Sequence, residues 1–410
     1  MRCQPHCTTI TLLSLFSTQL LFGGCGKVLY GDLDAGPLDH SPSDQRWEQG
    51  NPDQGDARVD QRDTAPDEGD SRLDAPLACP QSGACLITVA GSGDAGAMNG
   101  LALQAEFDQP IAVGMGGQGE VLVVDFSNHL LRKINNGQVS TLAGSGWGDA
   151  IGPLLEAKFA FPEDLSSGGG MLFIANTRND SIRQVSTTNV QNVAGSSKGF
   201  VEGPVADAQF NHPCGLTHDS SGVIYVADRG NNVIRQIKEG VVSTLIGDST
   251  EGDKNGPGSS AQLNAPSAVA VDDSGKLYVA DTNNNKIKVY DPSSGLVSTL
   301  AGDGHHGYLN GDPLSARFAE PESLVVTPDG ATVYVADTHN HCIRKIAADP
   351  VGEVSTVAGQ CTKAGFADGA ATTEALLNSP HGVTLTDALN STALTIADTD
   401  NNRVRELINK

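Results

Sequence analysis

Apolar and polar residues alternate in short runs along most of this chain, and one pattern of runs returns six times. Each copy contains a stretch rich in β-branched residues that leads into an Asp or Asn. The six stretches are VLVVDF (121–126), MLFIAN (171–176), VIYVAD (223–228), KLYVAD (276–281), TVYVAD (332–337) and ALTIAD (393–398). Short runs of this kind, bounded by turn residues, predict β-strands.

Each copy holds three further strand signals. A proline stands before each copy, and successive prolines (Pro110, Pro162, Pro213, Pro266, Pro321 and Pro380) are 52, 51, 53, 55 and 59 residues apart. One strand follows the proline, as in SAVAVD (267–272). Another follows the Asp or Asn, as in NNVIRQI (231–237), and a closing run such as VSTLAG (139–144) ends the unit. We therefore expect four strands in each unit.

Six units of four short strands predict an all-β fold, a six-bladed β-propeller of four-stranded antiparallel blades. The predicted blades centre near residues 107–144, 159–195, 210–247, 263–302, 318–359 and 377–410. The last unit lacks a closing run, while an unassigned run, LITVAG (86–91), precedes the first unit. We predict that this N-terminal strand completes the last blade and closes the ring, which leaves no open sheet edge.

The repeats resemble a known family. Asn128, His129 and Leu130 spell the tripeptide of the NHL repeat, and the spacer AGSGWGDAIGPLLEAKFAFP (143–162) is similar to that of bacterial extracytoplasmic members, including lipoproteins. The resemblance covers about residues 86–410. It implies the propeller fold but not one activity, because similar propellers include RNA- and protein-binding modules, adhesion proteins, a peptide-amidating lyase and calcium-dependent lactonases.

The N-terminal residues predict export. An uncharged, largely apolar segment spans 8–22 and is followed by Gly23, Gly24 and Cys25, so residues 1–24 fit a signal peptide. Small residues before a cysteine resemble a lipobox, which implies a lipid on Cys25 and a place on the outer membrane or cell surface. A secreted protein in which Cys25 is incidental is the alternative. Residues 25–78 are rich in Pro, Gly and Asp and predict a disordered acidic tether.

The charge narrows the classes of partner. The 410 residues contain 49 Asp and Glu against 26 Lys and Arg, a net charge of −23. A surface this acidic repels phosphate, which argues against nucleic-acid binding. No stretch is long and apolar enough to span a bilayer, so contact with a membrane is expected only through the lipid on Cys25. We expect a monomer.

The recurrent Asp and Asn residues have a structural interpretation. A side-chain oxygen at the end of the second strand can accept backbone N–H bonds in the following turn. The six residues are Asp125, Asn176, Asp228, Asp281, Asp337 and Asp398. The Asn pairs that come next suit left-handed backbone positions, and His129 and His341 replace the second Asn, so we expect them to be turn residues too.

The residue after each proline should lie near one mouth of the central channel. Around the ring these residues are Ile111, Glu163, Cys214, Ser267, Glu322 and His381. The candidate binding ring comprises the polar or reactive members with one neighbour, namely Glu163, Asp164, Cys214, Glu322 and His381. We expect Glu322 near His381, because their blades are adjacent. The alternative is a set of solvated channel residues without a ligand.

Metal and cysteine chemistry give further hypotheses. Blade five carries His305, His306, His339 and His341, which could form a zinc site or a solvated His-rich loop. The segment 251–256 resembles the start of a calcium loop, but Gln262 stands where a bidentate Glu is needed. We expect no cofactor, with Ca²⁺ or Zn²⁺ as the open alternative. Candidate disulfides join Cys79 to Cys85 and Cys342 to Cys361, leaving Cys214 unpaired.

These observations favour a non-enzymatic scaffold on the cell envelope that binds a protein or glycan partner. The long loops between blades (145–161, 196–212, 248–265, 303–320 and 360–379) would form its recognition surface. One alternative is a metal-dependent lyase or lactonase that uses Glu163, Glu322 and His381 at the channel mouth. Another is an envelope spacer without a specific ligand.

Overall fold

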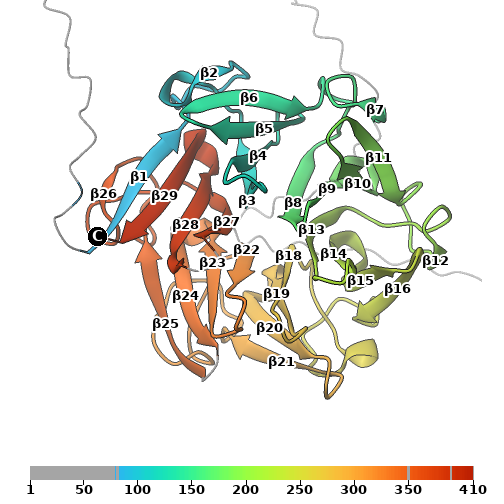
Figure 1. The fold of residues 1–410 in the computed structure, drawn as a ribbon. Helices are drawn as coiled ribbons and strands as arrows, with labels where there is room; N and C mark the ends of the chain where they lie inside the picture. Colours follow the sequence, from blue (N-terminus) through green and yellow to red (C-terminus); the bar gives the residue numbers. More distant parts are fainter. Residues whose placement is uncertain (1–78, 80–82, 349–350, 388–389, 410) are drawn as a thin grey trace, which may run out of the picture. The chain divides into compact units, whose positions relative to one another are not determined.

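The computed structural model describes residues 79, 83–348, 351–387 and 390–409. The signal segment, Cys25 and the tether lie outside the described residues. Within the described ranges the chain forms six antiparallel sheets arranged around a central axis (Figure 1). This confirms the predicted six-bladed propeller. Among these same residues, no helix is long and apolar enough to cross a membrane.

Blades one to three follow the predicted repeat. Blade one consists of β3 (Pro110–Met115), β4 (Val121–Asp125), β5 (Leu130–Asn135) and β6 (Gln138–Ala143). Blade two consists of β8 (Pro162–Gly168), β9 (Met171–Asn176), β10 (Ser181–Val185) and β11 (Asn189–Ala194). Blade three consists of β13 (Pro213–His218), β14 (Ile224–Asp228), β15 (Val233–Lys238) and β16 (Val241–Ile246). In each blade the strand that starts after the proline lies innermost (Figure 1).

Blades four to six complete the ring. Blade four consists of β18 (Ala268–Val271), β19 (Leu277–Asp281), β20 (Lys286–Asp291) and β21 (Leu296–Ala301). Blade five consists of β22 (Pro321–Val326), β23 (Thr332–Asp337), β24 (Cys342–Ala348) and β25 (Val351–Ala358). Blade six consists of β27 (Pro380–Asp387), β28 (Asn390–Asp398), β29 (Arg403–Asn409) and β1 (Ala84–Ala90).

The N-terminal strand β1 belongs to the last blade. It pairs antiparallel with β29, with Leu86 opposite Leu407 and Ala84 opposite Asn409. Figure 1 shows β1, in blue, beside the red C-terminal strands. Leu86 is fully buried in a cluster with residues of blades five and six. The sheet therefore joins the two ends of the propeller, as the closing run predicted.

The blades contain one feature that the prediction of four strands missed. Five of the six described sheets gain a two-residue strand at the outer edge, contributed by the loop that enters the blade. These strands are β2 (Gly100–Leu101), β7 (Gly152–Pro153), β12 (Gly203–Pro204), β17 (Gly256–Pro257) and β26 (Gly369–Ala370). In blade five Gly311 makes the corresponding bridge to Val354. The inter-blade loops thus also cover the outer edge, which protects unpaired backbone groups.

The apolar core lies between neighbouring blades. Each inter-blade loop places a large apolar residue in such a cluster, and these residues are at most 1% exposed: Phe107, Phe159, Phe210, Leu263, Phe318 and Leu377. Four of them are the aromatic of the A-x-F spacer motif. Short 3₁₀ helices supply the turns, namely η1 (Ala102–Gln104), η2 (Thr177–Asn179), η3 (Arg229–Asn231), η4 (Gly258–Ser260), η5 (Thr282–Asn284), η6 (Thr338–Asn340) and η7 (Thr399–Asn401).

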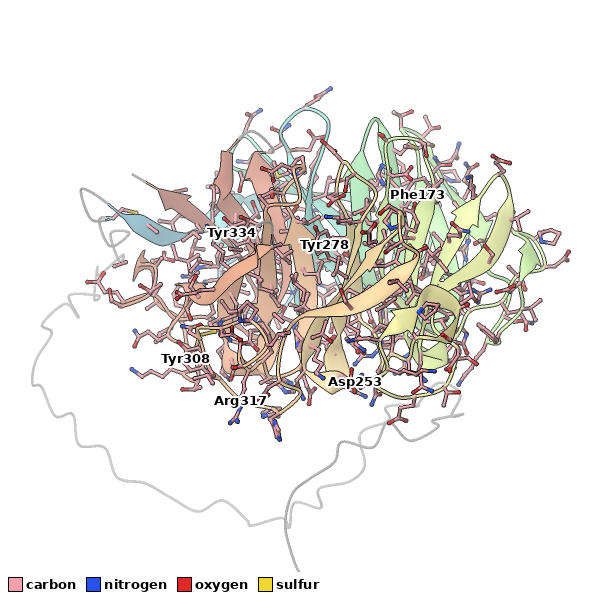
Figure 2. All side chains as sticks on the ribbon, turned by 90° about the horizontal axis from the view of Figure 1, so that it is seen from below. Phe173, Asp253, Tyr278, Tyr308, Arg317 and Tyr334 are labelled. Atoms are coloured by element: carbon pink, nitrogen blue, oxygen red, sulfur yellow. A yellow bond between two sulfur atoms is a disulfide. The ribbon has the colours of Figure 1, made fainter. Side chains whose placement is uncertain are left out.

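Inter-blade loops and the turns between second and third strands share one face, which we call the loop face. Asp253, Tyr308 and Arg317, from the loops before blades four and five, lie along one edge in Figure 2. Phe173 and Tyr278, from second strands, lie farther toward the opposite edge. Because every inner strand begins where such a loop ends, the predicted channel mouth opens on the loop face.

Candidate functional site

The channel mouth contains the residues that follow the six prolines. A cavity of about 30 Å³ there is lined by Ile111, Ala112, Glu163, Asp164, Cys214, Gly215, Ser267, Ala268, Glu322, Ser323 and His381. The structure therefore brings the five candidate ring residues together at one place. A space of this size holds only a few waters. The mouth is a constriction, and a larger ligand would have to sit above it on the loop face.

Arg229 contacts two of the residues that line this mouth, Cys214 and Glu322, and no sequence pattern used above indicated it. Its Nη1 lies 3.3 Å from Oε2 of Glu322 and its Nη2 3.5 Å from Oε1, so the two side chains form a forked ion pair. Both are mostly buried, with 24% and 15% of the side chain exposed. The Glu322 carboxylate raises the pKa of Arg229 well above its ordinary value. Glu322 thus pairs with Arg229 of blade three, and it lines the same cavity as His381, its expected neighbour.

Cys214 and Glu163 form a second contact in the ring. The thiol donates a hydrogen bond to Oε2 of Glu163, with sulfur and oxygen 2.7 Å apart. Burial raises the pKa of the Glu163 carboxyl, and the charge of Arg229 opposes that rise. Burial, followed by the charge of Glu163, raises the pKa of Cys214 well above its ordinary value. A neutral thiol is a poor nucleophile, so the arrangement does not activate Cys214.

Asp164 links two blades beneath the mouth. Its Oδ2 accepts a hydrogen bond of 2.8 Å from the backbone N–H of Leu216 in blade three. Burial raises the pKa of the Asp164 carboxyl to about 7, although that hydrogen bond acts in the opposite direction. This carboxyl therefore changes charge near neutral pH, unlike an ordinary surface aspartate.

His381 and Ser267 make local contacts. His381 Nδ1 lies 2.9 Å from the carbonyl oxygen of Ser379, two residues away. Ser267 donates to the carbonyl oxygen of Glu322 at 2.8 Å and also contacts the hydroxyl of Thr282 at 2.5 Å. These two residues line the cavity, and the Ser267 hydroxyl and the His381 Nδ1 are engaged within the ring.

Two repeated contacts hold neighbouring blades together around the mouth. In the first, a left-handed turn residue accepts a hydrogen bond from the backbone N–H of the residue before the next blade's proline. The six acceptors are His129, Asp180, Asn232, Asn285, His341 and Asn402, and their φ angles lie between 48° and 57°. The expectation that His129 and His341 are turn residues is confirmed.

The second contact is made by threonine. In four blades the residue that follows the recurrent Asp or Asn is a threonine, and its hydroxyl donates to the carbonyl oxygen of the next blade's proline. The four pairs are Thr177–Pro213, Thr282–Pro321, Thr338–Pro380 and Thr399–Pro110. Phe126 and Arg229 occupy the same position in blades one and three. This departure from threonine is the sequence signal that could have identified Arg229.

The repeated Asp residues have a wider role than the one predicted. Asp228 Oδ1 accepts from the backbone N–H of Asn211, in the loop before the blade, at 2.8 Å. Its Oδ2 pairs with Arg235 at 3.0 Å, and both side chains are fully buried. Equivalent buried pairs are Asp125–Arg132, Asp337–Arg344, Asp398–Arg405 and Asp281–Lys288. These oxygens therefore tie the preceding loop and the third strand. They also accept from the following turn, as predicted, but the donor is the side-chain amide of an Asn, such as Asn231 at 2.8 Å from Asp228, and not a backbone N–H.

The sector between blades one and two presents aromatic and cationic side chains on the loop face. The rings of Phe126 and Phe161 have centroids 5.0 Å apart, and the ring of His129 packs edge-on against Phe161 at 4.4 Å. The guanidinium of Arg178 lies 5.3 Å from the centroid of Phe161. Trp147, in the adjoining loop, is 64% exposed. We call Phe126, Trp147, Phe161 and Arg178 the aromatic sector.

The segment that resembles the start of a calcium loop, 251–256, engages its carboxylates within the protein. Asp253 pairs with the ammonium groups of Lys286 and Lys288, and Glu251 Oε1 accepts a hydrogen bond from Asn264 at 3.0 Å. Two lysines on one carboxylate leave it poorly suited to a divalent cation, because they would repel the ion.

The four blade-five histidines separate in the structure. His305 lies 3.3 Å from Asp303. His341 Nδ1 accepts the N–H of Ser379 at 3.0 Å. His306 and His339 instead approach Glu320, and one donor atom from each of these three lies within 4.8 Å of the others. The histidine hypothesis therefore named two members of this cluster and missed Glu320.

Cysteines pair as disulfides outside the ring. The structure bonds Cys79 to Cys85 beside the first strand, and Cys342 to Cys361 across the start of β24 and the loop after β25. Among the described cysteines, Cys214 is free and buried.

A wider cavity of about 270 Å³ lies along the channel beyond the mouth. Small and apolar residues of the inner strands line it, with a few hydroxyls such as that of Ser166. Ser166 Oγ lies 2.7 Å from Nδ1 of His218, whose Nε2 lies 3.2 Å from the carbonyl oxygen of Gly168. These contacts join blades two and three.

Comparisons with known proteins agree with the repeat pattern. The sequence model described as NHL repeat matches residues 263–290 and 318–346. NHL repeat-containing protein 2 of Gallus gallus is 29% identical over 316 residues, which cover 65% of this chain and 42% of that protein. The chain thus spans about two fifths of the length of this curated relative. These matches support an NHL-type β-propeller.

Solved structures share the fold. An auxiliary nutrient binding protein from Bacteroides thetaiotaomicron aligns with a TM-score of 0.61 at 18% identity, over 80% of this chain and 77% of that one. A gluconolactonase from Xanthomonas campestris aligns with a TM-score of 0.53 at 12% identity, over 82% of this chain and 97% of that one. At these identities the likeness extends to the fold alone.

Proposed function

We propose that this propeller is a non-enzymatic binding module that recognises a protein partner through its loop face. The observation that carries the proposal is the aromatic sector, where an exposed tryptophan, two phenylalanines and an arginine lie on the loop face between blades one and two. Tryptophan and arginine are the residue types that most often dominate the energy of protein–protein contacts. A glycan that stacks on Trp147 is the competing outcome of the test below.

The fold itself does not require these side chains. Trp147 forms a backbone bridge to Phe159, and the same bridge position in the other loops holds Ala95, Lys198, Glu251, His306 and Ala364. Alanine therefore satisfies the backbone geometry. Trp147 is 64% exposed at a position where alanine suffices, and aromatic residues such as tryptophan are enriched in protein–protein interfaces.

The net negative charge of the propeller favours a partner whose contacting surface is basic or neutral. From residue 77 onward the chain contains 20 Lys and Arg against 36 Asp and Glu. Complementary charge speeds association and suppresses wrong partners. We therefore expect association with the partner to weaken and slow as salt concentration rises.

The contacts in the mouth count against the alternative of a metal-dependent lyase or lactonase. Glu322 faces the guanidinium of Arg229, and Glu163 accepts from the Cys214 thiol. A cation at these carboxylates would have to displace Arg229 or share the site with its positive charge, which is electrostatically unfavourable. The likeness to a gluconolactonase concerns the fold and brings no ligand set to these residues.

We further propose that the module is exported and held on the cell envelope by a lipid on Cys25. The apolar segment before Gly23 and Gly24 supports this proposal, as does the acidic tether that would extend the propeller away from the surface. The test is cell fractionation of the full chain, with wild type expected in the membrane fraction and Cys25→Ser released. Equal membrane association of both would contradict the anchor.

The binding proposal is tested with the full chain immobilised and exposed to envelope extracts, with bound proteins identified after crosslinking. The double variant Trp147→Ala, Arg178→Ala should retain less of a partner whose binding saturates. The expected loss of binding free energy is about 1–3 kcal/mol for each substituted residue that is a hot spot. The matched control is Leu296→Ala, which removes a 47% exposed apolar side chain at the start of β21, away from the loop face. Equal retention of the partner by the double variant and by Leu296→Ala would overturn the proposal. Loss of binding after the extract is treated with glycosidase would indicate that the partner is a glycan.

A further inference from the structure

We propose that His306, Glu320 and His339 form a zinc-binding site on the loop face of blade five. One donor atom from each side chain lies within 4.8 Å of the other two. Nδ1 of His339 is 3.5 Å from Oε2 of Glu320, and the imidazole centroids of His306 and His339 are 6.5 Å apart. The proposal requires side-chain rotations that bring these donors from this spacing onto one tetrahedral zinc ion.

The backbone of each ligand is held in place by the fold. His306 bridges to Phe318, and the next residue, Gly307, donates its N–H to the Phe318 carbonyl oxygen at 3.0 Å. The N–H of His339 bonds the carbonyl oxygen of Ala319 at 3.1 Å. The N–H of Glu320 bonds Oδ1 of Asn285 at 3.0 Å. Only side-chain freedom is then lost on binding, which favours affinity.

The three residue types are particular to blade five. At the position of His306 the other blades have Ala95, Trp147, Lys198, Glu251 and Ala364. At the position of Glu320 they have Gln109, Phe161, His212, Ala265 and Ser379. At the position of His339 they have Ser127, Arg178, Gly230, Asn283 and Asp400. The backbone has the same conformation at these positions in the other blades, with different side chains. The fold therefore does not require two histidines and a glutamate together.

The donor set selects the ion. Two imidazoles and one carboxylate suit zinc, which takes nitrogen and oxygen ligands in tetrahedral geometry. Three protein ligands leave a fourth position for water or an atom of another molecule. His339 and Glu320 are 50% and 40% exposed, so an ion and an external ligand can reach the cluster from solvent. The neighbouring cation Arg317 is held by Asp303 at 2.8 Å.

The site is separate from the ring at the channel mouth. Glu320 precedes Glu322 by two residues, but Glu322 is committed to Arg229 and lies in the constriction. A metal on blade five would therefore mark a second feature of the loop face, adjacent to the mouth. It would offer a Lewis-acidic contact for an oxygen or nitrogen atom of a bound molecule.

Zinc titration of the full chain, without a histidine tag and stripped of metal, tests the site. We expect one tight zinc per chain by calorimetry, and Co²⁺ in its place should give the visible absorption of a tetrahedral complex. His306→Ala and His339→Ala should each weaken zinc binding more than about 100-fold, the upper end of the loss caused by removing an outer-shell partner. Glu320→Gln should weaken it at least about tenfold.

Two control variants separate this site from its surroundings. His305→Ala removes an adjacent exposed histidine and should leave zinc affinity unchanged, as should Glu322→Gln in the mouth. Far-UV circular dichroism of each metal-free variant checks the fold, and zinc should raise the Tm of wild type but not of His339→Ala. Zinc affinity unchanged by His306→Ala and His339→Ala, or no saturable binding by wild type, would overturn the proposal. Zinc lost on Glu322→Gln alone would instead support a metal in the channel mouth.

Discussion

Arg229 and Glu322 pair across the channel mouth although their blades are not neighbours, with Nη1 and Oε2 3.3 Å apart. Arg229 also lowers the pKa of the Glu163 carboxyl, which burial raises. Arg229→Thr restores the residue that most blades carry, but it leaves two carboxylates in the mouth without their cation. We expect a loss of about 1–3 kcal/mol at pH 8, below the roughly 3–5 kcal/mol for breaking a fully buried pair.

The loss should shrink as pH falls. An acid whose folded-state pKa is raised binds its proton more tightly in the folded state, so its ionisation costs stability as pH rises above the unfolded-state pKa. Removing Arg229 raises the pKa of Glu163 further and enlarges this cost. Urea denaturation at pH 5 and pH 8 measures it, with Arg229→Lys as the charge-preserving control. Equal losses at both pH values would show that Arg229 acts through packing alone.

Asp164 should give the wild-type protein a pH dependence of its own. Burial raises the pKa of this carboxyl to about 7 from an ordinary value of 3.8. Its contribution to stability is therefore greatest at acid pH and declines between about pH 4 and pH 7. Asp164→Asn keeps an acceptor for the Leu216 N–H and removes the ionisation.

Asp164→Asn should thus flatten the stability profile over that range and be more stable than wild type at pH 8. Chemical denaturation from pH 4.5 to pH 8.5 provides the measurement. Asp312→Asn, an exposed loop carboxylate, is the control and should leave the profile unchanged. A variant profile parallel to wild type would contradict the role assigned to Asp164.

Because β1 closes the ring, substitution of Leu86 should lower the stability of the propeller strongly. This side chain is fully buried between β29 and the neighbouring blade, in the position that Val139 occupies in blade one. Leu86→Ala should cost about 2–5 kcal/mol, as for other buried leucines. Met98→Ala, at a 50% exposed site nearby in sequence, should cost less than about 0.5 kcal/mol. Thermal denaturation compares them, and similar Tm values for both would mean that β1 does not seal the last blade.

The buried Asp–Arg pairs allow one blade to be rebuilt in the pattern of another. Blade two has Asn176 where blade three has Asp228, and its Arg183 pairs instead with Asp149 of the loop. Phe200 holds the loop position of Asp149 in blade three, where its ring lies 4.9 Å from the Arg235 guanidinium. Asp228→Asn alone should cost about 3–5 kcal/mol, because Arg235 stays buried without a counter-charge.

Adding Phe200→Asp to Asp228→Asn should recover part of that loss by copying the arrangement of blade two. A double-mutant cycle from denaturant midpoints gives the coupling between the two sites. Asp303→Ala, which removes the partner of the 45% exposed Arg317, should cost at most about 1 kcal/mol. Additive effects of the two blade-three substitutions would refute the equivalence of the loop and strand carboxylates.

Periodicity predicted the blades because each strand repeats a local pattern that one sequence displays six times. The prolines located the inner strands, and the last unit's lack of a closing run, together with the unassigned run 86–91, pointed to β1. The fifth strands escaped prediction because two residues such as Gly152 and Pro153 have no alternation to read. Their pairing depends on where the loop folds back, which is a tertiary property.

The candidate ring was predictable in membership but not in its pairings. Glu163, Cys214, Glu322 and His381 follow prolines and so fall at one mouth. Which of them touch depends on side-chain reach across the axis, as when Arg229 of blade three pairs with Glu322 of blade five across the mouth. The cluster around His339 similarly required the distance to Glu320, which belongs to a different loop segment.

Two of the six boundaries between blades lack the threonine hydroxyl contact. Hydroxyl contacts join blade two to blade three, and blades four, five, six and one to each other in turn. Phe126 and Arg229 stand at the remaining boundaries, where the turn residues His129 and Asn232 still bond the next blade. The hydroxyl contacts alone therefore group the blades into a set of two and a set of four. Transient local opening of the ring should begin at these two boundaries. The aromatic sector lies at one of them, and Arg229, which pairs with Glu322, lies at the other.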